Sequence, residues 1–324
     1  MPGDFEILHW ADLTGRQIDA IDRSRAVVLL SCSPLEVHGP HLPTITDAHE
    51  SEKLAEHSAR RLAEQHPEII FLQLPTLYVA TDVLPQVGSV RFRASTIVDV
   101  LGDLGRSVVK QGFRRIWVSN FHGGPRHFVA IERACERVNR RFGGEMISVF
   151  SMMISRLSGG NTDISDALGA LAGMSPDELR GDSHGGAIET SLMLYLLGAR
   201  VDAGYRDLAR ETVQRWVSGE HPGPPEPLPS NPLRLFEVFR QRMKYYEENT
   251  YAGAPAMASA EAGEQILARL SEMTAEALGE VWRGERSPAQ CHSPLWPLPQ
   301  RLLFSSESLL WLLEKLIRYR TQVF

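Results

Sequence analysis

The chain has 324 residues, of which 43% are hydrophobic and 23% charged, and its formal net charge is −6 at pH 7. This composition is that of a globular protein with a sizeable core, and the length suits one α/β domain with insertions. The negative charge, and a sequence without a basic tract of five or more residues, argue against nucleic acid as the main partner.

The cysteines and the two ends of the sequence indicate the cellular compartment in which we expect the protein. Cys32, Cys135 and Cys291 are odd in number and far apart, which favours neither a disulfide framework nor a thiolate zinc site. Residues 1–4 show no signal-peptide pattern, and the most apolar C-terminal run, 309–313, is far too short to cross a bilayer. We therefore expect a cytoplasmic protein without membrane attachment.

Predicted strands and helices alternate through the first half of the chain. Residues 4–24 suggest an edge segment and a short helix from Asp12 to Ile21. The apolar and amphipathic patterns then predict strands at 26–30, 69–72, 116–118 and 146–150, and helices at 48–65, 94–110 and 126–141. This alternation is typical of a three-layer α/β/α fold with a mainly parallel sheet and right-handed crossovers.

The second half of the chain reads as mainly helical. Its predicted helices lie at 166–179, 187–197, 233–247 and 256–283, and a proline-rich insert near 217–233 reads as a surface loop. The tail is broken by prolines and then helical from Ser305. We expect one α/β domain over 1–285 and a C-terminal helical extension over 286–324.

The loop after the first central strand carries Glu36, His38 and Asp47. In open α/β sheets ligands bind at the carboxyl ends of strands, and carboxylate and imidazole groups are suitable metal ligands. Simpler interpretations exist. Asp47 followed by Glu50 is a capping-box pattern at the start of a helix, and His38 alone could be a hydrogen-bonded loop residue.

Two further loops carry residues of the same kinds. His122 follows the third predicted strand, and it would face the first loop if the two strands are neighbours; His184 and Glu189 stand at the start of a predicted buried helix. Glycines beside these residues allow close backbone approach, as a metal or a phosphate site needs. The glycine pairs contain no lysine or arginine, so a P-loop is not favoured, although Arg126 leaves a phosphorylated substrate open.

These motifs resemble the creatininase (creatinine amidohydrolase) family over about residues 25–283. The likeness is carried by Glu-x-His-Gly-x-His-Leu-Pro at 36–43 with Asp47, by Asn-x-His-Gly-Gly at 120–124, by His-x-Gly-x-x-Glu-Thr-Ser at 184–191, and more weakly by 253–263. The resemblance implies two divalent ions at the carboxyl edge of the sheet, as zinc, manganese or iron. Glu36, His38 and His122 would be terminal ligands, Asp47 would bridge, and Glu189 would be a further ligand or a base.

The resemblance also implies a hydrolase of carbon–nitrogen bonds other than peptide bonds. A metal-bridged hydroxide would attack a cyclic amide, a formamide or another small amide. His184 is the expected proton donor, with a structural loop histidine as its alternative. Asp182 would orient His184 or contact substrate. Ser89 and Phe121 are expected at the substrate.

The sequence departs from the family pattern at three positions. Creatinine-hydrolysing members carry glutamate where this chain has Gly124, many members carry asparagine where it has Pro125, and many carry glutamate where it has Ala187. Creatinine is therefore not the expected substrate. Two alternatives to the amidohydrolase are a maturase-type metallopeptidase acting on a short modified peptide, and a non-catalytic binding protein. Relatives form ring-like homo-oligomers, often hexamers, so self-association is expected.

Overall fold

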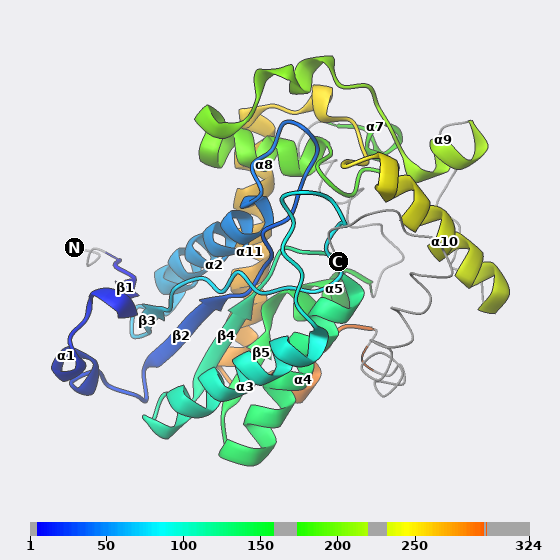
Figure 1. Cartoon of the computed structure of the whole chain (residues 1–324). Coiled ribbons are helices and arrows are strands. Elements are labelled where there is room, and N and C mark those ends of the chain that lie inside the picture. The colour runs from blue at the N-terminus through cyan, green and yellow to red at the C-terminus, as the bar shows by residue number, and fades with distance from the viewer. Residues whose placement is uncertain (1–4, 159–173, 220–231, 295, 297–324) are drawn as a thin grey trace.

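The computed structural model describes residues 5–158, 174–219, 232–294 and 296 (Figure 1). A five-stranded sheet lies at its centre, and every strand pair in it is parallel. Its strand order is β1-β3-β2-β4-β5, with β1 at Leu8–His9, β2 at Ala26–Ser31, β3 at Ile70–Gln73, β4 at Arg115–Ser119 and β5 at Glu145–Ser148.

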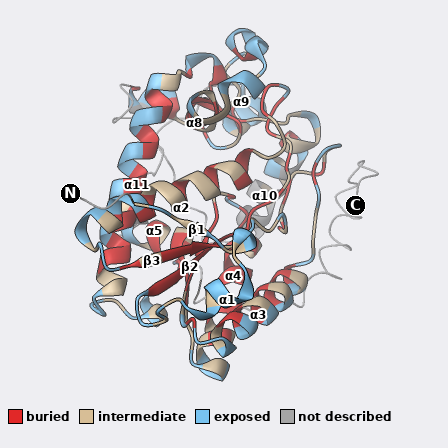
Figure 2. Ribbon diagram, turned by 90° about the vertical axis from the view of Figure 1, so that its left-hand side faces the viewer, coloured by how far each residue is buried: buried red, intermediate tan, exposed pale blue. Residues whose placement is uncertain are grey.

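Helices cover both faces of this sheet. Alternate residues of β2 point to opposite faces, as the period of a strand requires. Val28 and Leu30 pack with α3 (Ala94–Lys110) and α4 (Pro125–Phe142). Val27 and Leu29 pack with α2 (Thr46–Gln65), α5 (Val149–Ser158) and α11 (Ala260–Trp282). The predicted three-layer α/β/α fold is confirmed, and Figure 2 shows the buried residues on the sheet and on the inner sides of its helices.

The helices of residues 174–257 lie beyond the carboxyl ends of the strands (Figure 1). They are α7 (Pro176–Leu179), α8 (Ala187–Leu197), α9 (Val213–Ser218) and α10 (Pro232–Glu248), with short 3-10 turns at Gly198–Arg200, Ala203–Asp207 and Pro255–Met257. α8 is joined to the main layers by apolar packing on α11 and α2. The backbones of α8 and α11 approach so closely that a Cβ at Gly263 would overlap the Ser191 carbonyl.

Several element boundaries differ from the sequence prediction. β5 ends at Ser148 and α5 begins at once, because the Ser148 hydroxyl accepts the Ser151 N–H as a helix cap. The last long helix begins at Ala260 because Ser259 caps it, and Pro255–Met257 form a separate 3-10 turn. In the predicted N-terminal helix only Gly15–Asp19 is α-helical, after a 3-10 turn at Trp10–Asp12.

Some predictions fall outside the described residues. These are most of the helix at 166–179, the greater part of the 217–233 insert, and the helix from Ser305. Within the described tail, a 3-10 turn spans Pro288–Gln290, and Ser293 donates its N–H to the buried carboxylate of Glu132 on α4. A separate extension over 286–324 stays a prediction. Among the described residues, no helix has the length and apolarity needed to cross a membrane.

Candidate metal centre

The site begins where β2 and β4 end side by side. Ser31 and Ser119 are partners in the ladder, so the loops that follow them leave the same edge of the sheet. The first loop is held by its backbone: Gly39 has a φ of +68° and donates its N–H to the Thr250 carbonyl at 2.6 Å. A Cβ at Gly39 would lie 2.6 Å from the ring of His41. This tight course buries both Glu36 and His38.

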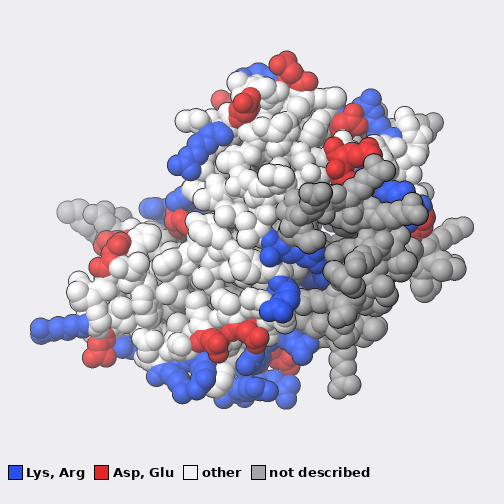
Figure 3. All heavy atoms as spheres, in the orientation of Figure 1, with Lys and Arg blue, Asp and Glu red and all other residues white. Residues whose placement is uncertain are grey.

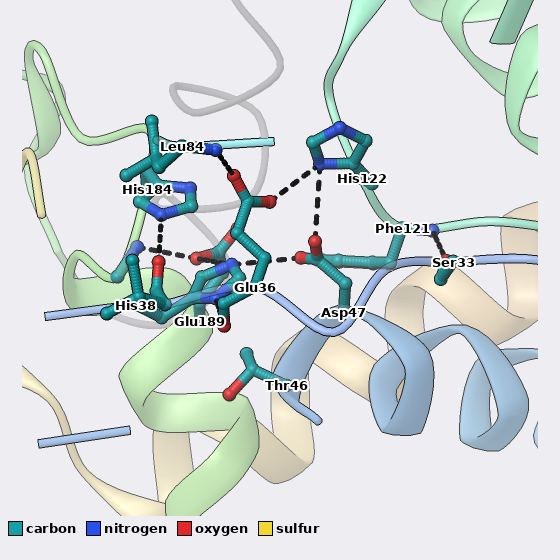
Figure 4. A network of polar contacts seen from close by, with 12 residues as sticks. Ser33, Glu36, His38, Thr46, Asp47, Leu84, Phe121, His122, His184 and Glu189 are labelled. Carbon is teal, nitrogen blue, oxygen red and sulfur yellow. Dashed lines mark hydrogen bonds and ion pairs between the residues drawn. The ribbon is translucent and has the colours of Figure 1, made fainter. Parts of the chain in front are cut away.

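Asp47 does not cap the following helix, so the capping-box interpretation is wrong. The N-cap of α2 is Ile45, which makes no side-chain cap, and Asp47 lies within the first turn. The reciprocal bond from Glu50 is also missing, because neither Glu50 carboxylate oxygen has a hydrogen-bond partner in the described part of the chain. The carboxylate of Asp47 is aimed instead at two imidazoles, where the amino end of a helix favours negative charge (Figure 4).

His38 presents one ring nitrogen to carboxylates and anchors the other. Its Nδ1 lies 3.0 Å from the Glu36 carbonyl oxygen, which can only accept, so Nδ1 carries the proton of a neutral ring. Nε2 then faces Asp47 Oδ1 at 3.0 Å and Glu189 Oε2 at 3.6 Å. A backbone carbonyl that fixes the tautomer of a histidine is a typical partner of a metal ligand.

His122 repeats this arrangement from the neighbouring loop. Its Nε2 lies 2.9 Å from the Thr81 carbonyl oxygen, so the proton of a neutral ring resides there. Nδ1 then faces Glu36 Oε2 at 2.9 Å and Asp47 Oδ2 at 3.3 Å (Figure 4). The other oxygen of Glu36 accepts the Leu84 N–H at 2.5 Å.

Glu189 enters the cluster from the first turn of α8. Its Oε2 accepts the Gly185 N–H at 2.6 Å. Asp182 holds the start of this helix, because its carboxylate accepts backbone N–H groups from Ala187, Ile188 and Ala254 at 2.7, 3.1 and 3.1 Å. These bonds fix the third motif loop to the start of α8 and to Ala254, whereas its contact with the first loop is His184 Nε2, which lies 2.8 Å from the Val37 carbonyl oxygen.

Two groups of candidate ligands share one residue. Glu36, Asp47 and His122 form one group, and His38, Asp47 and Glu189 form the other; in each, the ligand atoms lie within 4.8 Å of one another. The structure thus brings together all five predicted ligands, with Asp47 between the two groups.

The charges of the cluster favour cations between its side chains. Burial alone would lower the pKa of His38, but the carboxylates of Asp47 and Glu189 outweigh it and raise that pKa to about 10. Burial also opposes charge on His122, yet Glu36 and Asp47 raise its pKa well above the ordinary value. Two imidazoles whose ring lone pairs point at buried carboxylates must either take up protons or share a cation with those carboxylates.

The residues fit divalent metal ions. Glu36 Oε2 and Asp47 Oδ2 are buried and make no well-directed hydrogen bond within the described residues, although His122 Nδ1 is near both. Orphaned buried carboxylate oxygens are costly unless a cation or a proton satisfies them. Carboxylate oxygens together with imidazole nitrogens suit zinc, manganese and iron.

His184 lies against His38 at the edge of the cluster. Its Nε2 lies 2.8 Å from the Val37 carbonyl oxygen and therefore donates to it. Burial, with the neighbouring charge of His38, lowers the pKa of His184 to about 4, so the ring is neutral at pH 7. His184 also forms a third group of candidate ligands with Glu36 and His38. Its predicted role as proton donor stays a prediction.

Sequence reasoning gave Glu50 no role beyond helix capping. This carboxyl is 1% exposed, and burial, together with the charges of Glu189 and Asp47, raises its pKa well above the ordinary value. The Asp-x-x-Glu spacing that suggested a capping box was the only local signal. Glu50 lies one turn after Asp47 in α2, and the packing of α8 on α2 brings Glu189 near it as well.

A cavity of about 190 Å³ adjoins the cluster and is lined in part by Phe121, Asp182 and Glu189. Ser89, the third residue predicted to meet substrate, is not part of this lining; its hydroxyl accepts the Val37 N–H at 3.1 Å and holds the first loop. Contact of Ser89 with substrate stays a prediction.

A larger groove of about 700 Å³ lies between α3 and α4 and contains none of the candidate ligands. Arginines line it, and two of them pair with acids: Arg137 with Asp99 at 3.0 Å and Arg140 with Glu136 at 3.4 Å. Figure 3 shows basic side chains gathered below the sheet, where α3 and α4 lie in Figure 1. The smaller cavity is therefore the candidate substrate pocket.

Comparison with known proteins identifies relatives of this architecture. The sequence model of the Creatininase family, described as creatinine amidohydrolase, matches residues 11–278. No functionally curated protein matches the chain.

Solved structures share its fold. A manganese form of creatininase is 22% identical, with a TM-score of 0.56, and the match covers 86% of this chain and 99% of that one. A mutant creatininase of a Zn–Zn type is 20% identical (TM-score 0.55, coverage 87% and 99%). A protein of Bacteroides fragilis NCTC 9343, described as a candidate creatinine amidohydrolase, is 16% identical (TM-score 0.60, coverage 86% and 98%).

Proposed function

The chain belongs to the creatininase family, and from that premise we propose that it hydrolyses a small, non-peptide amide with two divalent ions held between its three motif loops. Family membership and the ligand cluster support a metal-dependent amide hydrolase. The number of ions, the kind of bond and the roles of individual residues are part of the proposal.

One observation carries the proposal: Asp47 belongs to both ligand groups, and the imidazole of each group is anchored to a backbone carbonyl through its far nitrogen. A carboxylate with one oxygen toward each group is suited to bridge two ions. The manganese and Zn–Zn forms of the related creatininases support divalent metal here. Zinc, manganese and iron all remain candidates for this ligand set.

When bound, such ions polarise an amide carbonyl and lower the pKa of water. The protein must then supply a group that moves protons near neutral pH. Without bound ions, burial and the charge of Asp47 raise the pKa of Glu189 to about 7, although His38 opposes the shift. Nearby cations would lower this pKa and favour the carboxylate, which is the form that accepts a proton. Because Glu189 Oε2 accepts the Gly185 N–H, we assign the proton transfer to the other oxygen, Oε1. Oε1 would take a proton from the attacking water and return it to the leaving nitrogen.

His184 is placed to assist this transfer as an acceptor. With its Nε2–H donated to Val37 and its pKa lowered to about 4, the ring offers the Nδ1 lone pair at neutral pH. To act as the proton donor that the sequence suggested, it would have to release the Val37 carbonyl or first take up a proton on Nδ1, which its lowered pKa opposes. Substitution of His184 separates either proton-transfer role from a role as metal ligand.

The structure favours a substrate other than creatinine. A Cβ at Gly124 would overlap His122 Nε2 and would come within 2.7 Å of Asp82. The glutamate that creatinine-hydrolysing members carry at this position therefore cannot be accommodated while His122 donates to Thr81. The cavity of about 190 Å³ also favours a small amide over the short modified peptide of a maturase.

The test is metal analysis combined with a substrate screen. We expect protein purified without chelators to hold close to two divalent ions per chain and to hydrolyse members of a panel of cyclic amides, formamides and small linear amides. Protein free of such ions would overturn the proposal and support a binding protein. Cleavage of short peptides in preference to every small amide would support the maturase alternative.

The family resemblance also suggests a homo-oligomer, which we retain as part of the proposal. Light scattering coupled to size-exclusion chromatography of the full chain tests it, with a hexamer as the expected size.

A further inference from the structure

Beside the candidate ligands lies a cavity with mainly apolar walls. Glu189 stands at its edge, and the side chains that enclose it come from the second motif loop and from α5, α8 and α11. The apolar residues of its lining are Leu54, Phe121, Val149, Phe150, Met153, Ile154, Ile188 and Leu270.

Most polar groups on the wall already have partners. Asn120 accepts the His122 N–H at 3.0 Å and donates to the His122 carbonyl at 2.8 Å, and the Ser119 hydroxyl donates to Ser51. The carboxylate of Asp182 accepts three backbone N–H groups. Two exceptions are Glu189 at the ligand cluster and Thr274, whose buried hydroxyl has no hydrogen-bond partner among the described residues. Elsewhere in this space a ligand would meet little free hydrogen-bonding capacity, and a polar group there would lose its hydration without compensation.

The walls are preformed. Met153, Ile188 and Leu270 are 6%, 8% and 7% exposed, so their positions are fixed by packing. Phe150 stands between two other rings, with centroid distances of 6.3 Å to Phe121 and 6.2 Å to Phe128. An apolar ligand group would enter without reorganising these side chains.

The volume limits the size of that group. A dry cavity of about 150 Å³ lined by aliphatic and aromatic side chains is known to hold benzene, and this one measures about 190 Å³. A neighbouring cavity shares Leu54, Val149 and Thr274 as walls but measures only about 10 Å³, which is about the room of one water. The cavity therefore has room for one group about the size of a benzene ring, and the neighbouring cavity does not extend it.

We infer that the substrate is an amide carrying one apolar group about the size of a benzene ring, which occupies this cavity while the scissile bond lies at Glu189. The inference rests on the proposed function and names its substrate class: a hydrophobic small amide in place of a polar guanidino compound. The favourable contribution to the free energy of substrate binding is the burial of hydrocarbon against Phe150, Met153 and Leu270.

The experiment uses straight-chain alkyl hydroxamates, whose head groups bind divalent metal, on the metal-loaded full chain. Burial of one methylene is worth about 0.8 kcal/mol, so Kd should fall by about fourfold per methylene. We expect calorimetry to show this decrease in Kd for each added methylene from acetohydroxamate to hexanohydroxamate. For longer chains Kd should decrease no further, because the cavity is then full. Benzohydroxamate should bind at least tenfold more tightly than acetohydroxamate.

Two variants locate the effect. Met153→Trp should remove the gain for longer chains while bound metal and the acetohydroxamate Kd change less than twofold, and Met257→Trp, at a position 36% exposed and outside the lining, is the matched control. Met153→Gln, which nearly conserves volume, should weaken hexanohydroxamate by about tenfold and serves if the tryptophan variant does not fold.

The outcomes separate this inference from the proposed function. Equal Kd values across the series on metal-loaded wild-type protein, or an undiminished chain-length gain in the folded Met153 variants, would overturn the apolar pocket and leave the metal centre standing. Protein that holds no divalent ion and binds no hydroxamate would overturn the proposed function, and the substrate class with it.

Discussion

The rings of His38 and His184 stack with their centroids 4.0 Å apart and their planes at 24°. The two histidines come from different motif loops, and each donates one ring N–H to a backbone carbonyl of the first loop. They differ in charge when no ion is bound, because Asp47 and Glu189 raise the pKa of His38 to about 10, whereas burial lowers that of His184 to about 4.

Replacement of His184 tests which of its roles is correct. We expect His184→Ala to keep its bound metal and to lose turnover by at least about 10²-fold, the lower range for a proton-transfer group. Metal content by mass spectrometry and kcat on the best amide substrate are the two measurements. His57→Ala, on α2 and outside the ligand groups, is the control. Parallel loss of metal and turnover would place His184 in the ligand set.

Replacement of Asp47 tests the shared position. Because Asp47 belongs to both ligand groups and Glu189 to one, Asp47→Asn should leave less than one ion per chain, whereas Glu189→Gln should leave about one. Ion stoichiometry after dialysis against metal-free buffer measures this. Asp19→Asn, at an exposed carboxylate, controls for loss of charge. Two ions retained in Asp47→Asn would rule out the bridging role.

The sheet and part of the site could be predicted from local patterns. The apolar run of β2 and the strand–helix alternation indicated a parallel sheet, and parallel strands bring the loops that follow Ser31 and Ser119 to one edge. His122 could therefore be expected opposite Glu36 only if the two strands are neighbours, and the pairing of β2 with β4 meets that condition. The boundaries failed where one serine cap decides them, at Ser148 and Ser259.

The position of α8 beside this edge of the sheet could not be predicted from local sequence patterns. It depends on close packing of α8 on α11 at Gly263, a long-range contact that leaves no periodic signal in either segment. The family motifs placed Glu189 in the site instead. For Asp47 the local pattern alone favoured a helix cap and the family motif a metal ligand, because Asp-x-x-Glu at a helix start is the same for a capping box and for two buried carboxylates with other partners.

Removal of metal should make stability depend on pH. In ion-free protein the folded-state pKa of His38, about 10, lies above the ordinary 6.5, so its stabilising charge is fully present below about pH 6.5 and is lost as pH rises toward 10. Bound ions require neutral imidazole and are held more tightly as pH rises. We expect the difference in Tm between metal-loaded and chelator-treated protein to widen by several degrees from pH 6.5 to 9.5. A constant difference by differential scanning fluorimetry would contradict this.

Replacement of Asp182 distinguishes a positioning role from contact with substrate. Asp182→Ala leaves three backbone N–H groups without their acceptor and should lower the free energy of unfolding by at least about 3 kcal/mol, since each unsatisfied buried group costs about 1–3 kcal/mol. Asp182→Asn should lower the free energy of unfolding less, because one oxygen remains to accept backbone N–H groups. Urea denaturation measures both, with the exposed Asp177→Asn as control. An unchanged stability with a raised KM in Asp182→Asn would instead support the predicted contact with substrate.

Replacement of Glu50 should stabilise the protein at neutral and alkaline pH. Burial, with the charges of Glu189 and Asp47, raises the folded-state pKa of Glu50 well above the ordinary 4.5. Its ionisation is therefore disfavoured in the folded state, and wild-type stability falls as pH rises above 4.5 through the raised pKa. Glu50→Gln keeps the shape of the side chain, and because glutamine does not ionise it removes this loss of stability with rising pH. We expect its Tm to exceed that of the wild type at pH 8 and the two to converge near pH 4.5. Because neither Glu50 oxygen has a hydrogen-bond partner among the described residues, an equal or lower Tm at pH 8 would mean that the carboxylate is needed charged, as a partner of bound cations.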